Sequence, residues 1–160
     1  MWKKTAEIYL DYHLEGFDEL MSGTLMVRDV MTTAVKTVRI DTSVRDAVRK
    51  MNKFFIGSIL IVDEKRLVGI LTERDILRRI VEQGTDASII RVKDIMSSPV
   101  ITVHPETNIE DAAQLMTQKQ IKKLPVMEEG KLVGVVTSMD LMQAAPTIVK
   151  LLEDLLRREI

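Results

Sequence analysis

The chain matches itself when it is shifted by 65 residues, and the match needs no gap. The segment Val27–Met31 corresponds to Val92–Met96, and Leu67–Thr72 corresponds to Leu132–Thr137. A period that occurs twice indicates two copies of one supersecondary unit rather than a long solenoid. Two related copies tend to pack through equivalent faces and to leave equivalent clefts between them. We therefore look for function in those clefts.

The size of the copies bounds the domain organisation. A chain of 160 residues forms one compact domain or two very small ones. Each copy would be only marginally stable alone, so we expect the two copies to share one core. We divide the chain into an N-terminal amphipathic helix at 1–24, a first repeat at 25–84, a second repeat at 85–145 and a C-terminal amphipathic helix at 146–160.

The same local patterns recur in each copy and predict an α+β (α/β) fold with the order β-α-β-β-α. Short β-branched runs at 35–38 and 100–103 predict a first strand, and helix starts follow at 42–43 and in a capping-box pattern at 107–110. Hairpins are predicted with strands at 58–62 and 67–72, and again at 124–127 and 132–137. A last helix is expected to begin at Thr72 and at Thr137.

Composition argues against several classes of function. Hydrophobic residues make up 46% of the chain, and the 23 basic and 24 acidic residues give no global attraction to nucleic acid or membrane. The chain has no cysteine, and its 2 histidines lie in unrelated segments. We therefore expect no catalytic residues, no metal site and no enzyme activity. The lack of a signal peptide and of a long apolar run predicts a cytoplasmic protein.

Three motifs recur in both copies and carry a family resemblance. Each copy opens with V-x-D-[VI]-M-[TS], has an [IL]-x-V strand in its hairpin, and closes with G-[IV]-[LV]-T-x-x-D. Over about residues 27–144 the chain resembles the CBS domain, named after cystathionine β-synthase. The resemblance implies a tandem pair, or Bateman module, with pseudo-twofold symmetry and two clefts that often bind adenosine compounds. Such pairs commonly dimerise.

The two T-x-x-D motifs, Thr72–Asp75 and Thr137–Asp140, have two compatible interpretations. Threonine and aspartate in this pattern cap the first backbone N–H groups of a helix. A helix N-terminus also binds anions, so a phosphate can lie where the threonine hydroxyl and the N–H groups point. An aspartate one turn in can accept hydrogen bonds from both hydroxyls of a ribose. Both copies are thus candidates for nucleotide or nucleoside binding.

The resemblance implies that each cleft is shared, with the base held by one copy and the ribose and phosphates by the other. In one cleft the base would lie against Ser97, Ile101 and the segment Ile121–Leu124, opposite Thr72, Arg74 and Asp75. In the other cleft the base would lie against Thr32, Lys36, Ile56, Gly57 and Ser58, opposite Thr137, Met139 and Asp140.

The candidate clefts differ in their charged residues. Arg74 corresponds to Met139, and the pair Lys122-Lys123 corresponds to Gly57-Ser58. Lys122 and Lys123 are similar in position to basic residues that reach phosphate in the gamma subunit of AMP-activated kinase, although exposed lysines at a strand edge also blunt edge pairing. Lys36 departs from the small or apolar residue usual beside a base. The asymmetry favours the cleft of the first motif for a phosphorylated ligand.

Two hypotheses for function remain open. The first is a regulatory or sensor module that binds AMP, ADP, ATP or an S-adenosylmethionine-like compound as a regulatory ligand, with no cofactor, and acts on a separate, unidentified protein target. The second is a protein-interaction scaffold or dimerisation module whose T-x-x-D motifs are helix caps only. Apolar stripes on the terminal helices, with Leu10 and Phe17 on one and Leu151 and Leu155 on the other, predict a homodimer. The alternative is that these helices dock on the pair of repeats of their own chain.

Overall fold

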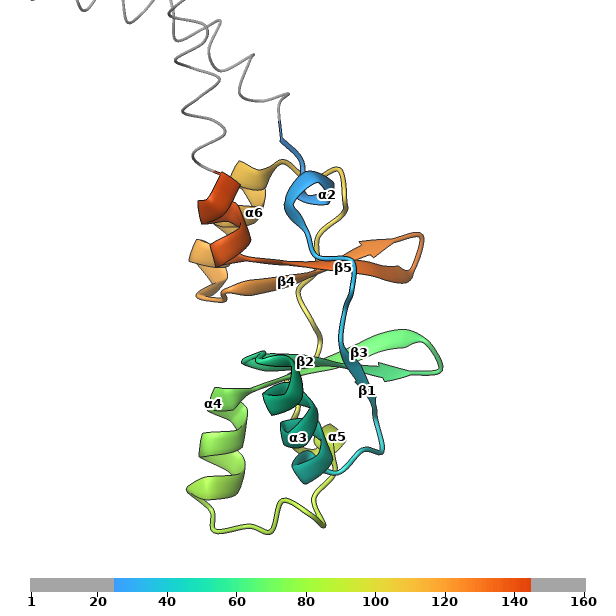
Figure 1. Ribbon diagram of the computed structural model, residues 1–160, viewed down its shortest axis with the longest axis vertical. Coiled ribbons are helices and arrows are strands. Elements are labelled where there is room, and N and C mark those ends of the chain that lie inside the picture. Colours follow the sequence, from blue (N-terminus) through green and yellow to red (C-terminus); the bar gives the residue numbers. More distant parts are fainter. Residues whose placement is uncertain (1–24, 145–160) are drawn as a thin grey trace, which may run out of the picture. The chain divides into compact units, whose positions relative to one another are not determined.

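The computed structural model describes residues 25–144, so the terminal helices predicted at 1–24 and 146–160 lie outside the described residues. The described chain forms two compact units (Figure 1). Unit 1 contains residues 25–31, 103–126 and 135–144, and unit 2 contains residues 32–102 and 127–134. Each unit therefore takes segments from both sequence repeats.

Unit 2 is built on a three-stranded sheet in the order β1-β2-β3. Strand β1 (Thr37–Arg39) runs parallel to β2 (Ser58–Asp63), which pairs antiparallel with β3 (Arg66–Thr72). The hairpin turns through Glu64 and Lys65, which both have positive φ (44° and 71°). Such a turn matches the right-handed twist of the two strands that it joins.

Three helical segments cover one side of this sheet in Figure 1: α3 (Val44–Phe54), α4 (Glu73–Ile76) with its π-helical continuation η1 (Leu77–Val81), and α5 (Val92–Ile95). Helix α3 buries Val44, Ala47 and Met51, spaced so that they share one face. They belong to one core cluster with Ile59 and Leu71 of the sheet. The apolar periodicity of α3 thus fixes which face it turns to the strands.

Unit 1 repeats much of this plan. It contains α2 (Val27–Val30), α6 (Ile109–Lys119) and a helix that begins at Ser138 and is described as far as residue 144. Strands β4 (Lys123–Glu128) and β5 (Lys131–Thr137) form a hairpin that starts and ends in this unit. Helix α6 buries Ile109, Ala112 and Met116, at the positions that correspond to the buried face of α3.

The first strand of the second repeat, predicted at 100–103, is absent from the described residues except for one parallel bridge between Val103 and Val126. Val103 N donates to Pro125 O at 3.0 Å, but proline has no N–H with which to return a bond. In the first repeat the corresponding residue is Leu60, which pairs with Thr37. Pro105 corresponds to Ile40, whose N–H donates to Val62 O at 3.1 Å in the first repeat. Two prolines, Pro105 and Pro125, therefore reduce the strand to a bridge.

The prediction of a capping box at 107–110 is wrong. Asn108 is the N-cap of α6, and its Oδ1 accepts a hydrogen bond from Glu110 N at 2.8 Å. Thr107 Oγ1 instead accepts from His104 N at 3.1 Å. Asparagine is one of the strongest N-cap residues, so the cap moves to it.

The opening helix of each repeat packs in the unit that contains the long helix of the other repeat. Val27 N of α2 donates to Thr107 O at 2.8 Å, just before α6 begins. Val92 N of α5 donates to Thr42 O at 2.9 Å, just before α3 begins. The segments V-x-D-[VI]-M are therefore short helices that pack at the start of the other repeat's long helix.

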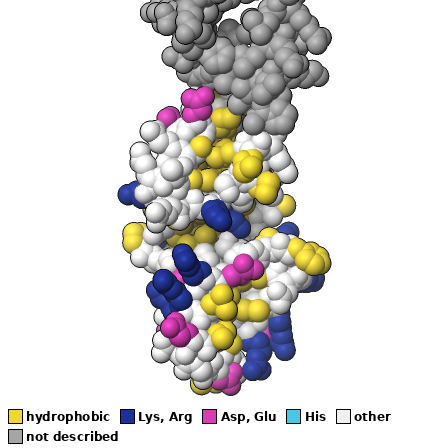
Figure 2. All heavy atoms as spheres, turned by 90° about the vertical axis from the view of Figure 1, so that its left-hand side faces the viewer, with side chains coloured by type: hydrophobic (Ala, Val, Ile, Leu, Met, Phe, Trp, Pro, Cys, Tyr) yellow, Lys and Arg dark blue, Asp and Glu magenta, His cyan; other side chains and the backbone are white. Residues whose placement is uncertain are grey.

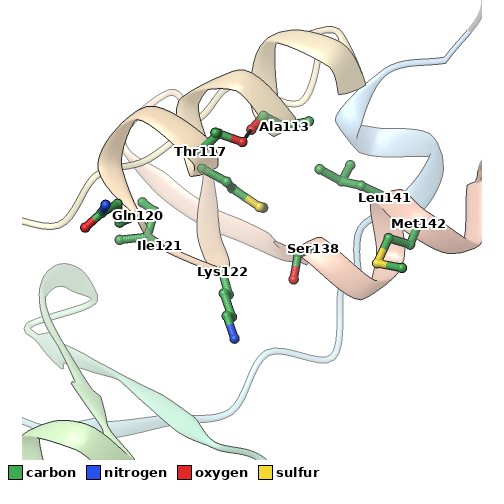
Figure 3. Close-up of a pocket in the computed structure, with 9 residues that line it drawn as sticks. Ala113, Thr117, Gln120, Ile121, Lys122, Ser138, Leu141 and Met142 are labelled. Carbon is green, nitrogen blue, oxygen red and sulfur yellow. Dashed lines mark hydrogen bonds between the residues drawn. The ribbon is translucent and has the colours of Figure 1, made fainter.

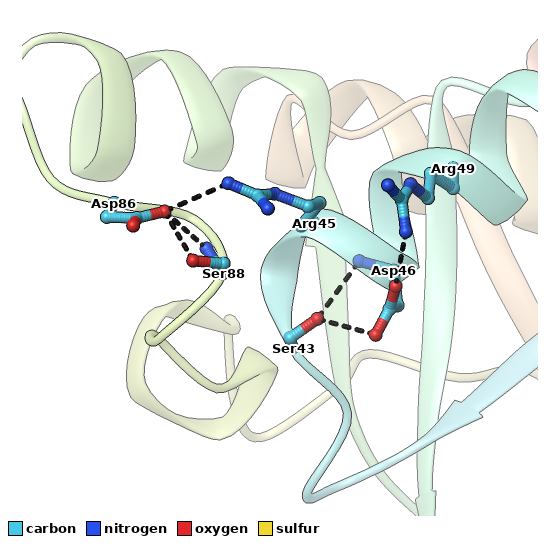
Figure 4. Close-up of polar contacts among 6 residues, drawn as sticks. All are labelled: Ser43, Arg45, Asp46, Arg49, Asp86 and Ser88. Atoms are coloured by element: carbon cyan, nitrogen blue, oxygen red, sulfur yellow. Dashed lines mark hydrogen bonds and ion pairs between the residues drawn. The ribbon is translucent and has the colours of Figure 1, made fainter.

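Polar contacts anchor the segment before α5 to helix α3 (Figure 4). Asp86 Oδ1 accepts from Ser88 N at 2.8 Å and Ser88 Oγ at 2.7 Å, and Arg45 lies 3.3 Å away. The two hydrogen bonds from Ser88, helped by the Arg45 charge, lower the pKa of the exposed Asp86 carboxyl below its ordinary value. At the start of α3, Ser43 Oγ accepts from Asp46 N at 3.1 Å.

Candidate functional site

The first T-x-x-D motif forms a complete capping box at the start of α4. Asp75 Oδ2 accepts hydrogen bonds from Thr72 N at 2.9 Å and from Thr72 Oγ1 at 2.7 Å. Thr72 Oγ1 in turn accepts from Asp75 N at 3.2 Å. The cap fixes both side chains at the carboxyl end of β3, and it leaves Oδ1 of Asp75 outside this network.

The second motif has the same geometry. Asp140 Oδ2 accepts from Thr137 N and Thr137 Oγ1, both at 2.7 Å, and Asp140 N donates to Thr137 Oγ1 at 3.2 Å. Each motif therefore sets its helix start with the same three bonds, and any functional difference between them comes from their neighbours.

Ser97 lies beside the first motif. It is one of the residues that the sequence analysis placed in the same cleft as that motif. Its backbone extends the sheet: Ser97 N donates to Ile70 O at 2.9 Å, and Ile70 N donates to Ser97 O at 3.1 Å. Its hydroxyl makes a long contact of 3.4 Å to Asp75 Oδ1. Because this bond is long and therefore weak, Oδ1 retains capacity to accept a stronger donor.

The remaining residues of that predicted cleft are divided between the units. Arg74 is exposed at the start of α4, and Ile101 is exposed in the chain segment after Ser97, both in unit 2. Ile121 and Lys122 lie in unit 1 between α6 and β4, and Lys123 is the first residue of β4. Lys122 O accepts from Ser138 N at 3.0 Å. The cleft that would combine these two sets of residues stays a prediction.

The second predicted cleft is divided in the same way. Thr32, Ile56, Gly57 and Ser58 lie in unit 2, whereas Thr137 and Asp140 lie in unit 1. Ser58 is 8% exposed, and among the described residues its hydroxyl has no hydrogen-bond partner. In the β2–β3 register Ser58 lies opposite Thr72 of the first motif. A buried hydroxyl without a partner costs about 1–3 kcal/mol, so this site is suited to receive a hydrogen-bonding group.

Two residues of this region were not singled out from the sequence. Glu73 N donates to Gly57 O at 3.1 Å. The Glu73 carboxylate lies close to Gly57, since a Cβ added to Gly57 would be only 3.2 Å from Glu73 Oε2. Phe54 lies under Lys36, with the ammonium 4.5 Å from the ring centroid. The sequence did contain a signal for Glu73, since it corresponds to an uncharged Ser138 in the other repeat.

Unit 1 also contains an open groove of about 540 Å³ between α6 and the helix that begins at Ser138 (Figure 3). Side chains of both helices and of the segment that joins α6 to β4 line it: Ala113, Met116, Thr117, Gln120, Ile121, Lys122, Ser138, Leu141 and Met142. Figure 3 shows Leu141 and Met142 on the wall opposite α6. The sequence analysis did not predict this groove.

Within residues 25–144, no group of three or more His, Cys, Asp or Glu side chains is placed to hold a metal ion. Over the same residues, no helix combines the length and the apolar composition needed to cross a membrane.

Comparison with known proteins agrees with this fold. The CBS domain family model matches residues 27–82 and 92–147. The CBS domain-containing protein YhcV of Bacillus subtilis is 39% identical over 115 residues, covering 72% of this chain and 81% of YhcV. The crystal structure of CBSX2 in complex with AMP is similar with a TM-score of 0.69 and 29% identity, covering 78% of this chain and 98% of CBSX2. A hexameric CBS-CP12 protein from bloom-forming cyanobacteria is similar with a TM-score of 0.69 and 30% identity, covering 75% of this chain and 67% of that one.

Proposed function

The chain belongs to the CBS domain family, with two CBS domains in tandem, and we propose that it is a regulatory sensor module that binds an adenosine-containing ligand. The ligand class is AMP, ADP, ATP or an S-adenosylmethionine-like compound. The similar protein CBSX2 has been crystallised with AMP. The ligand acts as a regulator and not as a cofactor, the module acts on a separate protein in the cytoplasm, and the chain itself is not an enzyme.

The observation that carries this proposal is the set of hydrogen bonds that the two oxygens of the Asp75 carboxylate accept. Its Oδ2 is held by two bonds from Thr72, and its Oδ1 has only the 3.4 Å contact from Ser97. A ribose offers two neighbouring hydroxyl donors, and bonds from hydroxyls to a fixed carboxylate are among the stronger hydrogen bonds in proteins. The helix cap thus presents a carboxylate whose orientation is fixed before the ligand arrives.

Charges around the two motifs favour a phosphorylated ligand at the first. Arg74 is exposed directly beside Asp75, whereas the second motif has Met139 at that position. Lys122 and Lys123 are proposed to reach the phosphates in the first cleft.

Self-association is part of the proposal. The similar CBS-CP12 protein is hexameric, and we infer that this chain forms a homodimer, to which the segments 1–24 and 146–160 contribute. The oligomer would pass the ligand-bound state to the regulated protein.

A protein-interaction scaffold is the alternative function. It is favoured by one observation, namely that in both T-x-x-D motifs the aspartate and the threonine bond to each other and cap the start of the helix. Helix caps alone account for a threonine and an aspartate at this spacing.

The test compares Asp75→Ala with Asp140→Ala by calorimetric titration with AMP. Each variant loses the same capping contacts, so Asp140→Ala is a matched control for lost helix stability. Loss of a charge-assisted contact to the ribose costs about 1.5–3 kcal/mol, which corresponds to roughly tenfold or more in Kd. We expect the larger loss in Asp75→Ala. Equal affinities in both variants and the unmodified chain would support the scaffold instead.

A further inference from the structure

The groove of about 540 Å³ in unit 1 presents apolar side chains to solvent. Five of its nine lining residues are apolar, and Met142 on one wall is 68% exposed. Figure 2 shows hydrophobic side chains at the surface of unit 1, on the face that it turns to the viewer. A cavity of about 150 Å³ already holds a benzene-sized ring, so the groove has room for several apolar side chains. An exposed apolar surface of this kind is suited to the docking of another segment.

The charge of the groove is basic and lies at one end. Among the described residues, Lys122 is the one charged side chain in the lining. Its carbonyl oxygen accepts from Ser138 N at 3.0 Å, which puts Lys122 at the start of the second wall helix. Lys119, in the last turn of α6, adds a second positive charge at the same end. A matching occupant is apolar along its length and acidic at this end.

The chain enters unit 1 at the other end of the groove. Ile109 N donates to Leu25 O at 3.3 Å, and Met26 forms a β-bridge with Asn108. Leu25 therefore lies at the start of α6, and the groove lining begins about one turn further on, at Ala113. The segment 1–24 is thus attached beside the groove of its own chain.

The segment is long enough to follow the groove. The α6 wall from Ala113 to Gln120 spans about 10 Å, and the helix predicted for Leu10–Met21 would span about 16 Å. Ser22-Gly23 separates that helix from Leu25 and provides a turn at which the chain can reverse. An attachment this short gives the segment a local concentration in the millimolar range at its own groove. At micromolar protein concentration this favours its own chain over a second copy.

The sequence of the segment matches the groove in both respects. Its apolar stripe consists of Leu10, Leu14, Phe17 and Met21. Glu7, Asp11 and Asp18 follow the helical spacing i, i+4 and i+11, so in the predicted helix they border that stripe on one side. The segment 1–24 has five acidic and two basic residues, whereas 146–160 has three of each. Charge therefore selects the N-terminal segment over the C-terminal one as the occupant.

We propose that the N-terminal segment docks its apolar stripe in the α6 groove of its own chain. Reversal of the chain before Leu25 puts Leu14 against the wall of Met142 and Asp11 beside Lys122. Docking covers the exposed methionine and pairs the one charge of the groove. The inference goes beyond the proposed function, because it holds with or without an adenosine ligand, and the opposite side of the segment remains available to the homodimer.

Cysteine pairs test the contact, since the chain has no cysteine of its own. The full chain carrying Leu14→Cys and Met142→Cys is compared with one carrying Glu15→Cys and Met142→Cys. The two positions are neighbours in sequence, but Leu14 lies on the stripe and Glu15 does not. A disulfide requires Cβ atoms about 3.5–4.5 Å apart, so we expect the Leu14 pair to close about tenfold faster or more under mild oxidation. Equal rates overturn the proposal, since an undocked segment brings both positions to Met142 alike.

The linked product identifies the occupant of the groove. A disulfide within one chain supports the proposal, whereas disulfide-linked dimers would assign the groove to a second copy and overturn it. Leu152→Cys with Met142→Cys tests the segment 146–160 in the same way. Faster closure of this pair than of the Leu14 pair also overturns the proposal.

Charge exchange tests the register of the docked segment. Lys122→Glu is expected to slow closure of the Leu14 pair several-fold at low salt, because a carboxylate would then face an acidic segment. Adding Asp11→Lys should restore most of the rate. Glu19→Lys changes the net charge equally but lies on the opposite side of the predicted helix, so it should not restore the rate. Equal restoration by both substitutions would overturn the contact between Asp11 and Lys122.

Discussion

Gly69 lies where β3 meets the end of α5. A Cβ built at this position would collide with the Met96 side chain, including its Cβ at 3.1 Å. Met96 in turn packs against the core cluster of unit 2 and directly precedes Ser97. The glycine is therefore required by close approach rather than by backbone conformation, and it helps to hold Ser97 against the sheet beside Asp75.

The substitution Gly69→Ala is expected to destabilise the protein. Forcing an extra carbon into a packed contact costs typically 1–3 kcal/mol, and the added carbon here meets the Met96 side chain along its length, from Sδ to Cβ. Chemical denaturation of the variant would measure the loss.

Gly57→Ala is the matched control, because a Cβ there meets only the end of the Glu73 side chain at 3.2 Å, which can move. A Gly69→Ala variant as stable as Gly57→Ala would show that Met96 has more freedom than this packing implies.

The helices and strands show which parts of the fold could be predicted from the sequence and which could not. The order of local patterns predicted the α+β fold, and the resemblance carried by the three motifs predicted the CBS family; both are confirmed. The hairpins and the helices that begin after Thr72 and Thr137 are where they were expected. These elements are determined by local signals, namely turn residues, helix caps and apolar periodicity.

Elements that depend on a distant partner were harder to predict. The strand expected at 100–103 is reduced to a bridge because its partner in another element, Pro125, accepts one bond but has no N–H with which to return one. The opening helices α2 and α5 bond to the residues just before the other repeat's long helix. No local sequence pattern predicts that they pack on the other repeat rather than on their own. Glu73 was missed although its correspondence to an uncharged Ser138 marks it in the sequence, because the contact of its carboxylate with Gly57 is visible only in the structure. The predicted site residues themselves remain to be tested.

Lys122, which directly precedes β4, and Lys123, its first residue, are the two lysines of the candidate phosphate site. We expect the double substitution Lys122→Ala and Lys123→Ala to lower the affinity for AMP or ATP far more than for adenosine. Phosphate contacts of exposed lysines are screened by salt, so the AMP affinity of the unmodified chain should also fall as salt rises. Isothermal titration at two salt concentrations measures both effects.

Arg74 is left in place in this experiment, so that the first motif keeps its own cation. Equal losses for AMP and adenosine would place the two lysines outside the phosphate site and would favour a role at the strand edge.

The whole molecule is held together by exchanged segments. Because α2 is bonded to Thr107 and α5 to Thr42, neither repeat contains all the backbone partners that it uses. Unfolding of the two repeats should therefore be coupled, and a ligand that binds either motif would stabilise both.

The C-terminal segment 146–160 is expected to contribute to the homodimer. A chain that ends at Ala145 loses the apolar residues Leu151, Leu152 and Leu155. If these side chains contribute to the homodimer, the shortened chain should dissociate at a higher protein concentration than the full chain in light scattering. An unchanged dimer after truncation would show that these side chains do not contribute to the interface.

The central claim is that the chain binds an adenosine compound, and thermal unfolding of the unmodified full chain with a ligand panel tests it most directly. The panel is adenosine, AMP, ADP, ATP and S-adenosylmethionine, with inorganic phosphate as the control. A ligand at 100 times its Kd stabilises the folded state by about 2.7 kcal/mol. We predict that at least one phosphorylated member raises the unfolding midpoint in a concentration-dependent manner and that phosphate alone does not. An unfolding midpoint that no member of the panel shifts at millimolar concentration would contradict the claim.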